Sequence, residues 1–428
     1  MRLEALSVEE IIDEMVGLSK SGDMSVLINH ACMLDSRVNE LDENYIKSLI
    51  LNEEVPEIVR VTMLQISEKI ADSDSMNWDE LYLHILEDKN ENVALKNNAV
   101  WALSASERTE AALEYIIRDD SETGEVAFQS LKRLDVDNPE RALSLAENIL
   151  SEHKIADVHR LKQAIKVISN SLEKGSKVVD SSAFVATCEG ILNASDDATL
   201  NDTILYALKD VGSAEAVEVL LSHEKVDDMF KCVNLYEGTY EASISPSAIS
   251  GTKLGYAVFR DGAGINPSWH AGLMVEESSA ITNCIVHITD LDSGVIEDSL
   301  TNFKNGQEFK GIYRPKNGFT NAKRTLVADK ARELVTEEIN YTLLQQVKYS
   351  SMGIDVTTKA EPNLITHIRC DGVTEYCYEY YDMRVFGGVA NWNIAINNTA
   401  NVNAHYGNAV NPETQATTYL TLVNREEP

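Results

Sequence analysis

A cysteine stands at the start of a predicted helix, in the stretch Arg369-Cys370-Asp371-Gly372-Val373-Thr374-Glu375-Tyr376. The unpaired backbone N–H groups and the dipole at a helix N-terminus stabilise an anion, so Cys370 is a candidate thiolate nucleophile. Gly372 leaves room for another backbone segment to approach closely. A lone cysteine is more often a half-buried structural residue, and this stretch alone assigns no activity.

A histidine that could accept the thiol proton lies earlier in the chain. His270 opens the apolar run from Trp269 to Val275, and an imidazole at the mouth of a strand can face a cleft and act as a general base. The alternative is a solvent-exposed or capping histidine. The residue types at 270 and 370 are therefore those of a thiol-dependent acyl transfer.

A second histidine, His287, lies in the next apolar strand, Cys284–Thr289. If the two strands pair antiparallel, His287 could bond to His270 and hold it in one tautomer, which is the orienting role in a catalytic triad. A core histidine bonded to a backbone carbonyl is the alternative. Asn283 and Asp290 are substitutes for the orienting role if the strand register favours them.

The elements that must position these residues follow residue 232, where Gly, Thr, Tyr and Asn become common and β-branched residues alternate. This composition and alternation predict an α+β domain over residues 231–428 with an antiparallel sheet, in which most strands precede the nucleophile helix. Residues 345–368 are expected to form a loop or an inserted hairpin, and the tail after Gly388 has no assigned chemistry. The predicted strands are Leu254–Arg260, His270–Glu276, Cys284–Thr289 and Phe309–Tyr313, and the predicted helices are Asn321–Glu338 and Cys370–Tyr381.

Residues 1–230 are expected to form a separate, acidic α-helical domain. Apolar residues recur at steps of three and four, and Gly and Pro are sparse. A degenerate repeat has anchor positions 31 to 40 residues apart, at Ile66, Leu103, Leu134, Ile168 and Leu208. This period suits a paired-helix solenoid and resembles HEAT repeats, which would bind a protein partner. The alternative is an irregular all-helical domain.

The charge of the chain excludes some partners. The net charge is −32, of which residues 1–230 carry −25 and residues 231–428 carry −7. Phosphate backbones and anionic membrane surfaces would repel such a chain, so we expect neither nucleic acid nor a membrane surface as partner. No apolar run is long enough to span a bilayer, and the N-terminus is too polar for a secretory signal, so we expect a cytoplasmic protein unless export follows a non-standard route. The six cysteines do not have the spacing of a disulfide framework.

Taken together, the C-terminal motifs resemble a known family. The stretch from Cys370 to Tyr376 looks like the Cys-Ser-Gly nucleophile helix of NlpC-type, papain-like cysteine peptidases and amidases. Both histidines precede the cysteine here, an order similar to that of the circularly permuted, YiiX-like branch. Further segments similar to that branch are Gly255–Arg260, Ile312–Pro315, the helix containing Ala328–Leu334, Ile339–Tyr341 and Val410–Thr414.

The resemblance implies a cysteine-dependent amide hydrolase that forms a thioester acyl-enzyme and needs no cofactor or metal. Cys370 would attack the acyl carbon, His270 would be the base and His287 would orient it. The Cys370 backbone N–H, together with Tyr341 and Gly372, would stabilise the oxyanion or contact substrate. The substrate would be a peptide or acyl amide, by analogy a cell-wall peptide.

The sequence departs from the family pattern at two points. Asp371 replaces a small hydroxyl residue and would raise the pKa of the thiol unless its charge is offset. The interval between Tyr341 and Cys370 is also long. Two rival activities stay open: a thioesterase, lipid acyltransferase or deamidase using the same residues, or a catalytically inactive binding module joined to a helical scaffold.

Overall fold

The structure, a computed structural model, describes most of the 428 residues. Residues 1–2, 21–26, 72–74, 120–122, 153–156, 176–178, 224–251, 263–268, 279, 281–282, 292–293, 351–357, 386–392 and 398–410 are outside the described part. Cys232, the expected domain boundary at residue 230 and much of the tail after Gly388 fall in these ranges.

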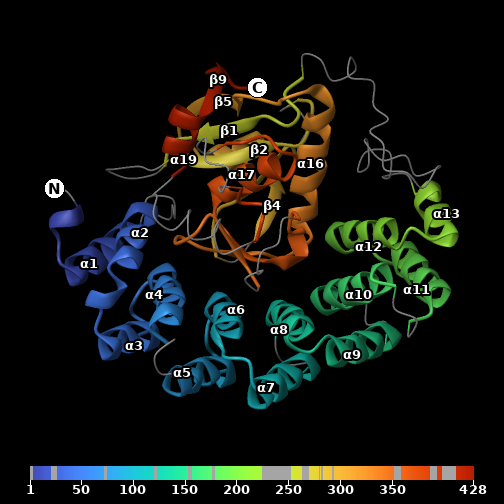
Figure 1. The fold of residues 1–428 in the computed structure, drawn as a ribbon, viewed down its shortest axis with the longest axis horizontal. Helices are drawn as coiled ribbons and strands as arrows, with labels where there is room; N and C mark the ends of the chain where they lie inside the picture. The colour runs from blue at the N-terminus through green and yellow to red at the C-terminus, as the bar shows by residue number, and fades with distance from the viewer. Residues whose placement is uncertain are drawn as a thin grey trace. The chain divides into compact units, whose positions relative to one another are not determined.

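The chain divides into two compact units (Figure 1). One unit combines residues 1–81 with residues 245–428, and the other contains residues 82–244. This grouping differs from the expected division into residues 1–230 and 231–428, because the first helices pack with the C-terminal domain rather than only with the helices that follow them. Sequence periodicity reports the type of an element, whereas the partner of its apolar face is decided in space.

The described part of residues 1–81 is mainly helical. Several helices begin at side-chain caps, and Ser7 and Glu10 form a reciprocal capping box at the start of the first long helix. Asp42 caps α3 (Glu43–Leu51) with a single bond, which its side chain accepts from the Tyr45 N–H. The elements are η1 (Leu3–Ala5), α1 (Val8–Ser19), α2 (Ile28–Ser36), η3 (Val38–Glu40), α3 (Glu43–Leu51), α4 (Glu57–Ala71) and α5 (Ser75–Glu87), the last of which crosses the boundary between the units.

Residues 82–244 form a helix-rich unit. The helices from α7 to α10 pack in succession, as do those from α11 to α13. In addition, α8 packs against α6 and α10, and α10 packs against α12. Apolar residues from α7 through α13 share one buried core. The helices are α6 (Val93–Ala102), α7 (Glu107–Arg118), α8 (Gly124–Asp137), α9 (Pro139–Glu152), α10 (Val158–Glu173), α11 (Ser181–Ala194), α12 (Ala198–Val211) and α13 (Ala214–Ser222).

The C-terminal domain contains a six-stranded antiparallel sheet in the order β4-β3-β2-β1-β5-β9. Its strands are β1 (Ala257–Arg260), β2 (His270–Met274), β3 (Ile285–Ile288), β4 (Val295–Asp298), β5 (Phe309–Pro315) and β9 (Leu420–Asn424). A second sheet, β6-β8-β7, consists of β6 (Asn340–Tyr341), β7 (Val347–Tyr349) and β8 (Ile365–Ile368). The helical elements are α15 (Leu300–Lys304), α16 (Asn321–Val335), η4 (Pro362–Leu364), α17 (Cys370–Tyr380), α19 (Pro412–Thr414) and η5 (Gln415–Tyr419).

An N-terminal helix-rich part followed by an antiparallel-sheet domain agrees with the predicted α-helical and α+β order. The two predicted helices and four predicted strands of the C-terminal domain are present with ends shifted by a few residues. The expected loop or hairpin at 345–368 contains β7 and β8. No helix in the described ranges has both the length and the hydropathy needed to cross a membrane.

Candidate functional site

The two predicted histidines meet on the central sheet. β2 and β3 pair antiparallel with Leu273 opposite Val286, and continuing this register places His287 opposite Gly272, two residues from His270 on the same face. Nε2 of His270 and Nδ1 of His287 lie 3.1 Å apart, which is hydrogen-bond distance. The bond leaves Nδ1 of His270 as the ring nitrogen available for proton exchange.

Gly272 makes room for an aromatic ring against this pair. A Cβ at position 272 would lie 2.8 Å from the Phe303 ring and 2.7 Å from the Ile285 side chain. With no side chain there, Phe303 of α15 packs against both imidazoles, with ring centroids 5.5 Å from His270 and 5.2 Å from His287. The small residue thus holds the two rings in an apolar, close-packed setting.

Asp298 of β4 is the third member of this row, and the sequence interpretation did not include it. β4 pairs with β3 so that Asp298 is opposite Ile285, on the face that His287 shares. Its Oδ2 lies 3.7 Å from Nε2 of His287, an electrostatic contact too long for a hydrogen bond. Asn283 is exposed, and Asp290 accepts a bond from Thr289, so neither proposed substitute takes this place.

Burial keeps both imidazoles neutral. His270 is 2% exposed and His287 is 1% exposed. Burial, together with the Arg260 charge, holds the pKa of His270 well below its usual range. Burial also lowers the pKa of His287, although Asp298 opposes that shift. The interaction with the nearby His287, together with the bonds from Asn302 and Ser299, outweighs burial and holds the pKa of Asp298 below its ordinary value. A carboxylate facing Nε2 of His287 favours the proton there, which leaves Nδ1 of His287 to accept from His270.

Cys370 is the first residue of α17 and is fully buried. Arg369 offsets the negative charge that Asp371 introduces: its Nε donates to Oδ1 at 2.6 Å and its Nη2 to Oδ2 at 2.8 Å. Both partners are almost completely buried. A bidentate pair of this kind neutralises the carboxylate beside the thiol, so the departure from the family pattern at position 371 is compensated within one turn.

The turn before β7 supports the start of α17. A Cβ on Gly372 would lie 1.9 Å from the Gln346 carbonyl oxygen, so only glycine fits there. The Arg369 N–H donates to the same oxygen, and the Gln346 amide donates to both Asp371 and Glu375. Tyr341, the predicted oxyanion residue, is 1% exposed on β6 and pairs with Ile368 on β8.

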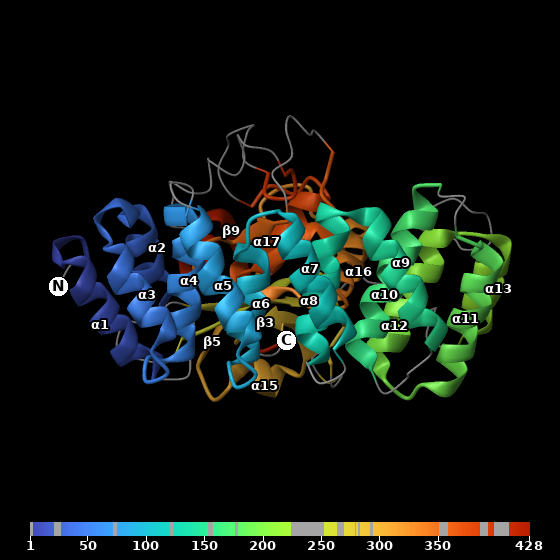
Figure 2. The ribbon, with the colours of Figure 1, turned by 90° about the horizontal axis from the view of Figure 1, so that it is seen from below.

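The two histidines and α17 lie on different sides of the sheet. Neighbouring strand residues point to opposite faces, and Phe303 of α15 covers the face that bears the imidazoles. On the other face, Arg332 of α16 contacts Glu297, the residue before Asp298, at 3.5 Å. α17 packs against α16, β2 and β3, and Figure 2 shows β3 between α15 and α17. The structure therefore brings the histidines together and places Cys370 at the start of a helix across the sheet from their rings.

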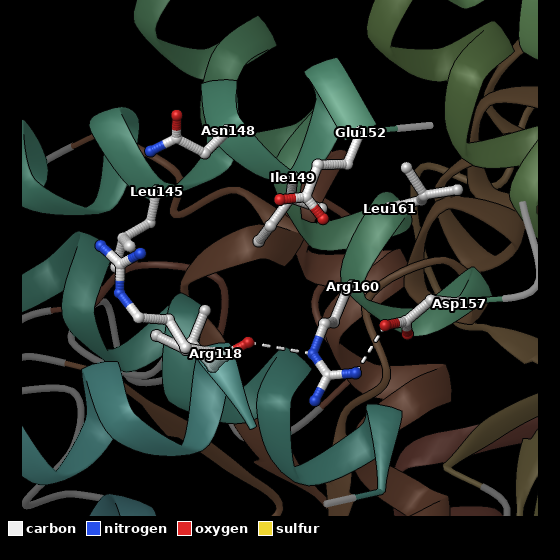
Figure 3. Close-up of a pocket in the computed structure, with 9 residues that line it drawn as sticks. Arg118, Leu145, Asn148, Ile149, Glu152, Asp157, Arg160 and Leu161 are labelled. Atoms are coloured by element: carbon white, nitrogen blue, oxygen red, sulfur yellow. Dashed lines mark hydrogen bonds and ion pairs between the residues drawn. The ribbon is translucent and has the colours of Figure 1, made fainter. Parts of the chain in front are cut away.

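A pocket in the helix-rich unit lies between α7, α9 and α10 (Figure 3). Its buried cation, Arg160, donates to the Ile117 and Asp119 carbonyl oxygens at the C-terminal end of α7 and to the Asp157 carboxylate. Arg160 therefore stabilises a helix end, and the pocket itself does not indicate a ligand.

Within the described ranges, no three His, Cys, Asp or Glu side chains are grouped to hold a metal ion. A scan against protein-family models and searches of curated proteins and of solved structures found no match for this chain.

Proposed function

We propose that the unit formed by residues 1–81 and 245–428 is a cysteine-dependent amide hydrolase of the permuted papain-like, NlpC type. The observation that carries the proposal is the 3.1 Å contact between His270 and His287, with the Asp298 carboxylate beyond it. This row gives a neutral His270 whose Nδ1 can accept a proton, as the general base of a thiol nucleophile requires. The substrate class, a peptide or acyl amide, follows from the family resemblance.

The reaction would proceed in two halves. His270 Nδ1 takes the proton of the Cys370 thiol, and the thiolate sulfur bonds to the amide carbonyl carbon. The carbon–nitrogen bond then breaks, the leaving amine takes the proton from His270, and a thioester remains on Cys370. Water loses a proton to His270 and attacks the thioester, which releases the carboxylic acid and restores the thiol. The Cys370 N–H and Tyr341 would stabilise the oxyanion.

This mechanism requires Cys370 Sγ to meet His270 Nδ1 around the end of β2. Each residue is the first of its element, and α17 packs against β2. The imidazoles lie on the side of the sheet that α15 covers. The sulfur and the imidazole must therefore meet at the end of β2 where His270 begins the strand. Substrate access also requires the chain around the buried cysteine to open.

Alkylation of the cysteines with iodoacetamide, followed by peptide mass spectrometry over about pH 5 to 9, tests the proposal. Cys188, Cys284 and Cys377 are equally buried references, and burial raises the pKa of each of these thiols. We expect Cys370 to react about tenfold faster than the references at neutral pH, because its thiolate is stabilised. His270→Ala should remove this advantage, and Cys370→Ala should abolish amide hydrolysis.

A second candidate is a binding module without catalysis. The specific observation in its favour is the complete burial of Cys370, together with the packing of α17 against β2 and β3 while Phe303 of α15 covers the imidazoles. In that case Arg369 and Asp371 form a structural ion pair only. Alkylation of Cys370 at the rate of Cys284, with no change in His270→Ala, would support this candidate and refute the hydrolase.

We also infer that residues 82–223 form HEAT-like repeats that bind a protein partner. Support comes from the row α6, α8, α10 and α12, whose members pack in succession, and from α7 and α9, which pack against members of this row. Such a pattern is typical of paired-helix arrays in which each repeat contacts its neighbours.

A further inference from the structure

α4, from the N-terminal part of the chain, is hydrogen-bonded to the turn between β6 and β7. The Gln65 side-chain amide donates to the Tyr341 carbonyl oxygen at 3.2 Å, and its Oε1 accepts from the Thr342 hydroxyl at 2.9 Å. Gln65 is 6% exposed and Thr342 is 4% exposed. Buried hydrogen bonds of this kind are costly to break, because the partner is left unsatisfied.

Further hydrogen bonds connect this turn to the start of α17. The Thr342 Oγ1 that bonds to Gln65 also accepts from the Leu344 N–H at 3.1 Å. Two residues later, the Gln346 carbonyl oxygen accepts from the Arg369 N–H and lies where a side chain on Gly372 would be. A shift of this turn would therefore move the backbone on either side of Cys370.

α2 contacts the same region through Cys32. Nη1 of Arg369 lies 3.7 Å from Cys32 Sγ and 3.4 Å from the Leu343 carbonyl oxygen. Burial raises the pKa of the Cys32 thiol despite the nearby Arg369, so Cys32 stays neutral. Glu68 of α4 adds an ion pair with Lys348 at 2.5 Å. Three residues of the N-terminal helices thus contact Arg369 or the turn from Tyr341 to Lys348.

We propose that Gln65 is a positioning residue for Cys370: through Thr342 and Gln346 it holds the first turn of α17 in place. The inference rests on the proposed hydrolase for its consequence in catalysis, but the positioning itself is a property of the fold. It assigns the N-terminal helices a part in the site, although no sequence motif connects them to it.

Two isosteric variants test the inference. Gln65→Leu removes both of its bonds to the turn, and Thr342→Val removes the hydroxyl that joins Gln65 to Leu344. Both changes nearly keep the side-chain volume, and Thr342→Ser keeps the hydroxyl. Gln129→Leu is the matched control, since Gln129 is a buried glutamine that accepts a bond from Trp101 in the other unit. The readouts are the pH profile of Cys370 alkylation and the hydrogen exchange of the amides of residues 371–374.

In Gln65→Leu and Thr342→Val we expect the apparent pKa of Cys370 to rise by about one unit, which slows alkylation at neutral pH about tenfold. The amides of the first turn of α17 should exchange faster. Thr342→Ser should behave as the wild type, and Gln129→Leu should change neither readout. If Gln65→Leu does not fold, the comparison of Thr342→Val with Thr342→Ser tests the positioning role.

Failure of this inference differs from failure of the hydrolase. Reactive wild-type Cys370 with an unchanged pH profile and unchanged exchange in Gln65→Leu and Thr342→Val would overturn the positioning role alone. An unreactive wild-type Cys370 would overturn the hydrolase. Faster exchange confined to residues 371–374 in the two variants would then still support the positioning role, and unchanged exchange would overturn it.

Discussion

At the scale of single residues, Asp298 determines the tautomers of His287 and His270. Its Oδ1 accepts from the Ser299 N–H and from Asn302 Nδ2, each at 2.7 Å. Its Oδ2 faces His287. Because the two donors hold Oδ1 in place, the atom presented to His287 is always Oδ2, an acceptor.

Asp298→Asn should therefore reverse the tautomers. The amide oxygen would stay with Ser299 and Asn302, and the amide nitrogen would face Nε2 of His287. The proton of His287 would move to Nδ1, and His270 would carry its own proton on Nδ1, where it cannot act as a base. We expect amide hydrolysis to fall about a hundredfold or more, and nitrogen NMR of the two rings should show the exchanged tautomers.

Asp290→Asn is the matched control for this prediction, because Asp290 was the carboxylate that the sequence offered as a substitute for the orienting role of His287. It bonds to Thr289 and should leave the tautomers of both rings unchanged. Unaltered ring signals in Asp298→Asn would remove Asp298 from the relay.

At the scale of elements, the start of α17 depends on contact between backbones. β8 leads directly into α17, and β7 beside it follows the turn that holds Gln346. Gly372 of α17 packs against this turn so closely that position 372 has space for a hydrogen atom but not for a side chain. The N-cap residue, Arg369, makes no side-chain capping bond, so the helix start is fixed by its contact with the turn before β7 of the second sheet.

Gly372→Ala should be strongly destabilising. A methyl group would lie 1.9 Å from the Gln346 carbonyl oxygen, a backbone atom that cannot rotate away. We expect a loss of about 3 kcal/mol or more in the free energy of unfolding, at the upper end for overpacking, measured by urea denaturation.

Gly190→Ala serves as the control at this scale. Gly190 lies within α11, and a Cβ there would meet nothing within 4 Å. This change should stabilise the protein by about 0.5–1 kcal/mol, because alanine restricts the unfolded chain. Equal effects of the two substitutions would contradict the tight contact at Gly372.

At the scale of the whole molecule, an acidic chain buries several of its carboxyl groups. Asp371, Glu375 and Glu379 are spaced four residues apart on α17, and all three are fully buried. Glu379 accepts from the Val385 and Ile394 N–H groups, and Arg384 lies 3.6 Å away. Burial, followed by the nearby Glu375, raises the pKa of Glu379 to about 8.

This shift makes stability depend on pH. The unfolded carboxyl titrates near 4.5 and the folded one near 8, so between these values the folded state binds the extra proton. Stability is therefore lost as pH rises through this window, by up to about 1.4 kcal/mol per pH unit. Glu379→Gln should flatten the slope, with some overall destabilisation since an amide nitrogen cannot accept from a backbone N–H.

Urea unfolding at several pH values within this window measures the slope. Glu54→Gln, a change at an exposed glutamate, should leave it unaltered. A slope in Glu379→Gln as steep as that of the wild type would show that the pKa of Glu379 is not raised.

The sequence alone was sufficient for the local elements. The helix from Cys370 and the strands from His270 and around His287 follow from periodicity and turn residues, which act over a few neighbours. It also indicated that His287 would lie beside His270, because adjacent antiparallel strands bring such residues together.

Only the tertiary structure decided the partners of these elements. Asp298 joins the row through the register of β4, and Gln65 contacts a turn 276 residues away in the chain. The side of the sheet on which α17 lies relative to the imidazoles likewise has no local signal. Pairing register and helix docking depend on which distant surfaces are complementary, and residue type and spacing along one chain do not carry that information.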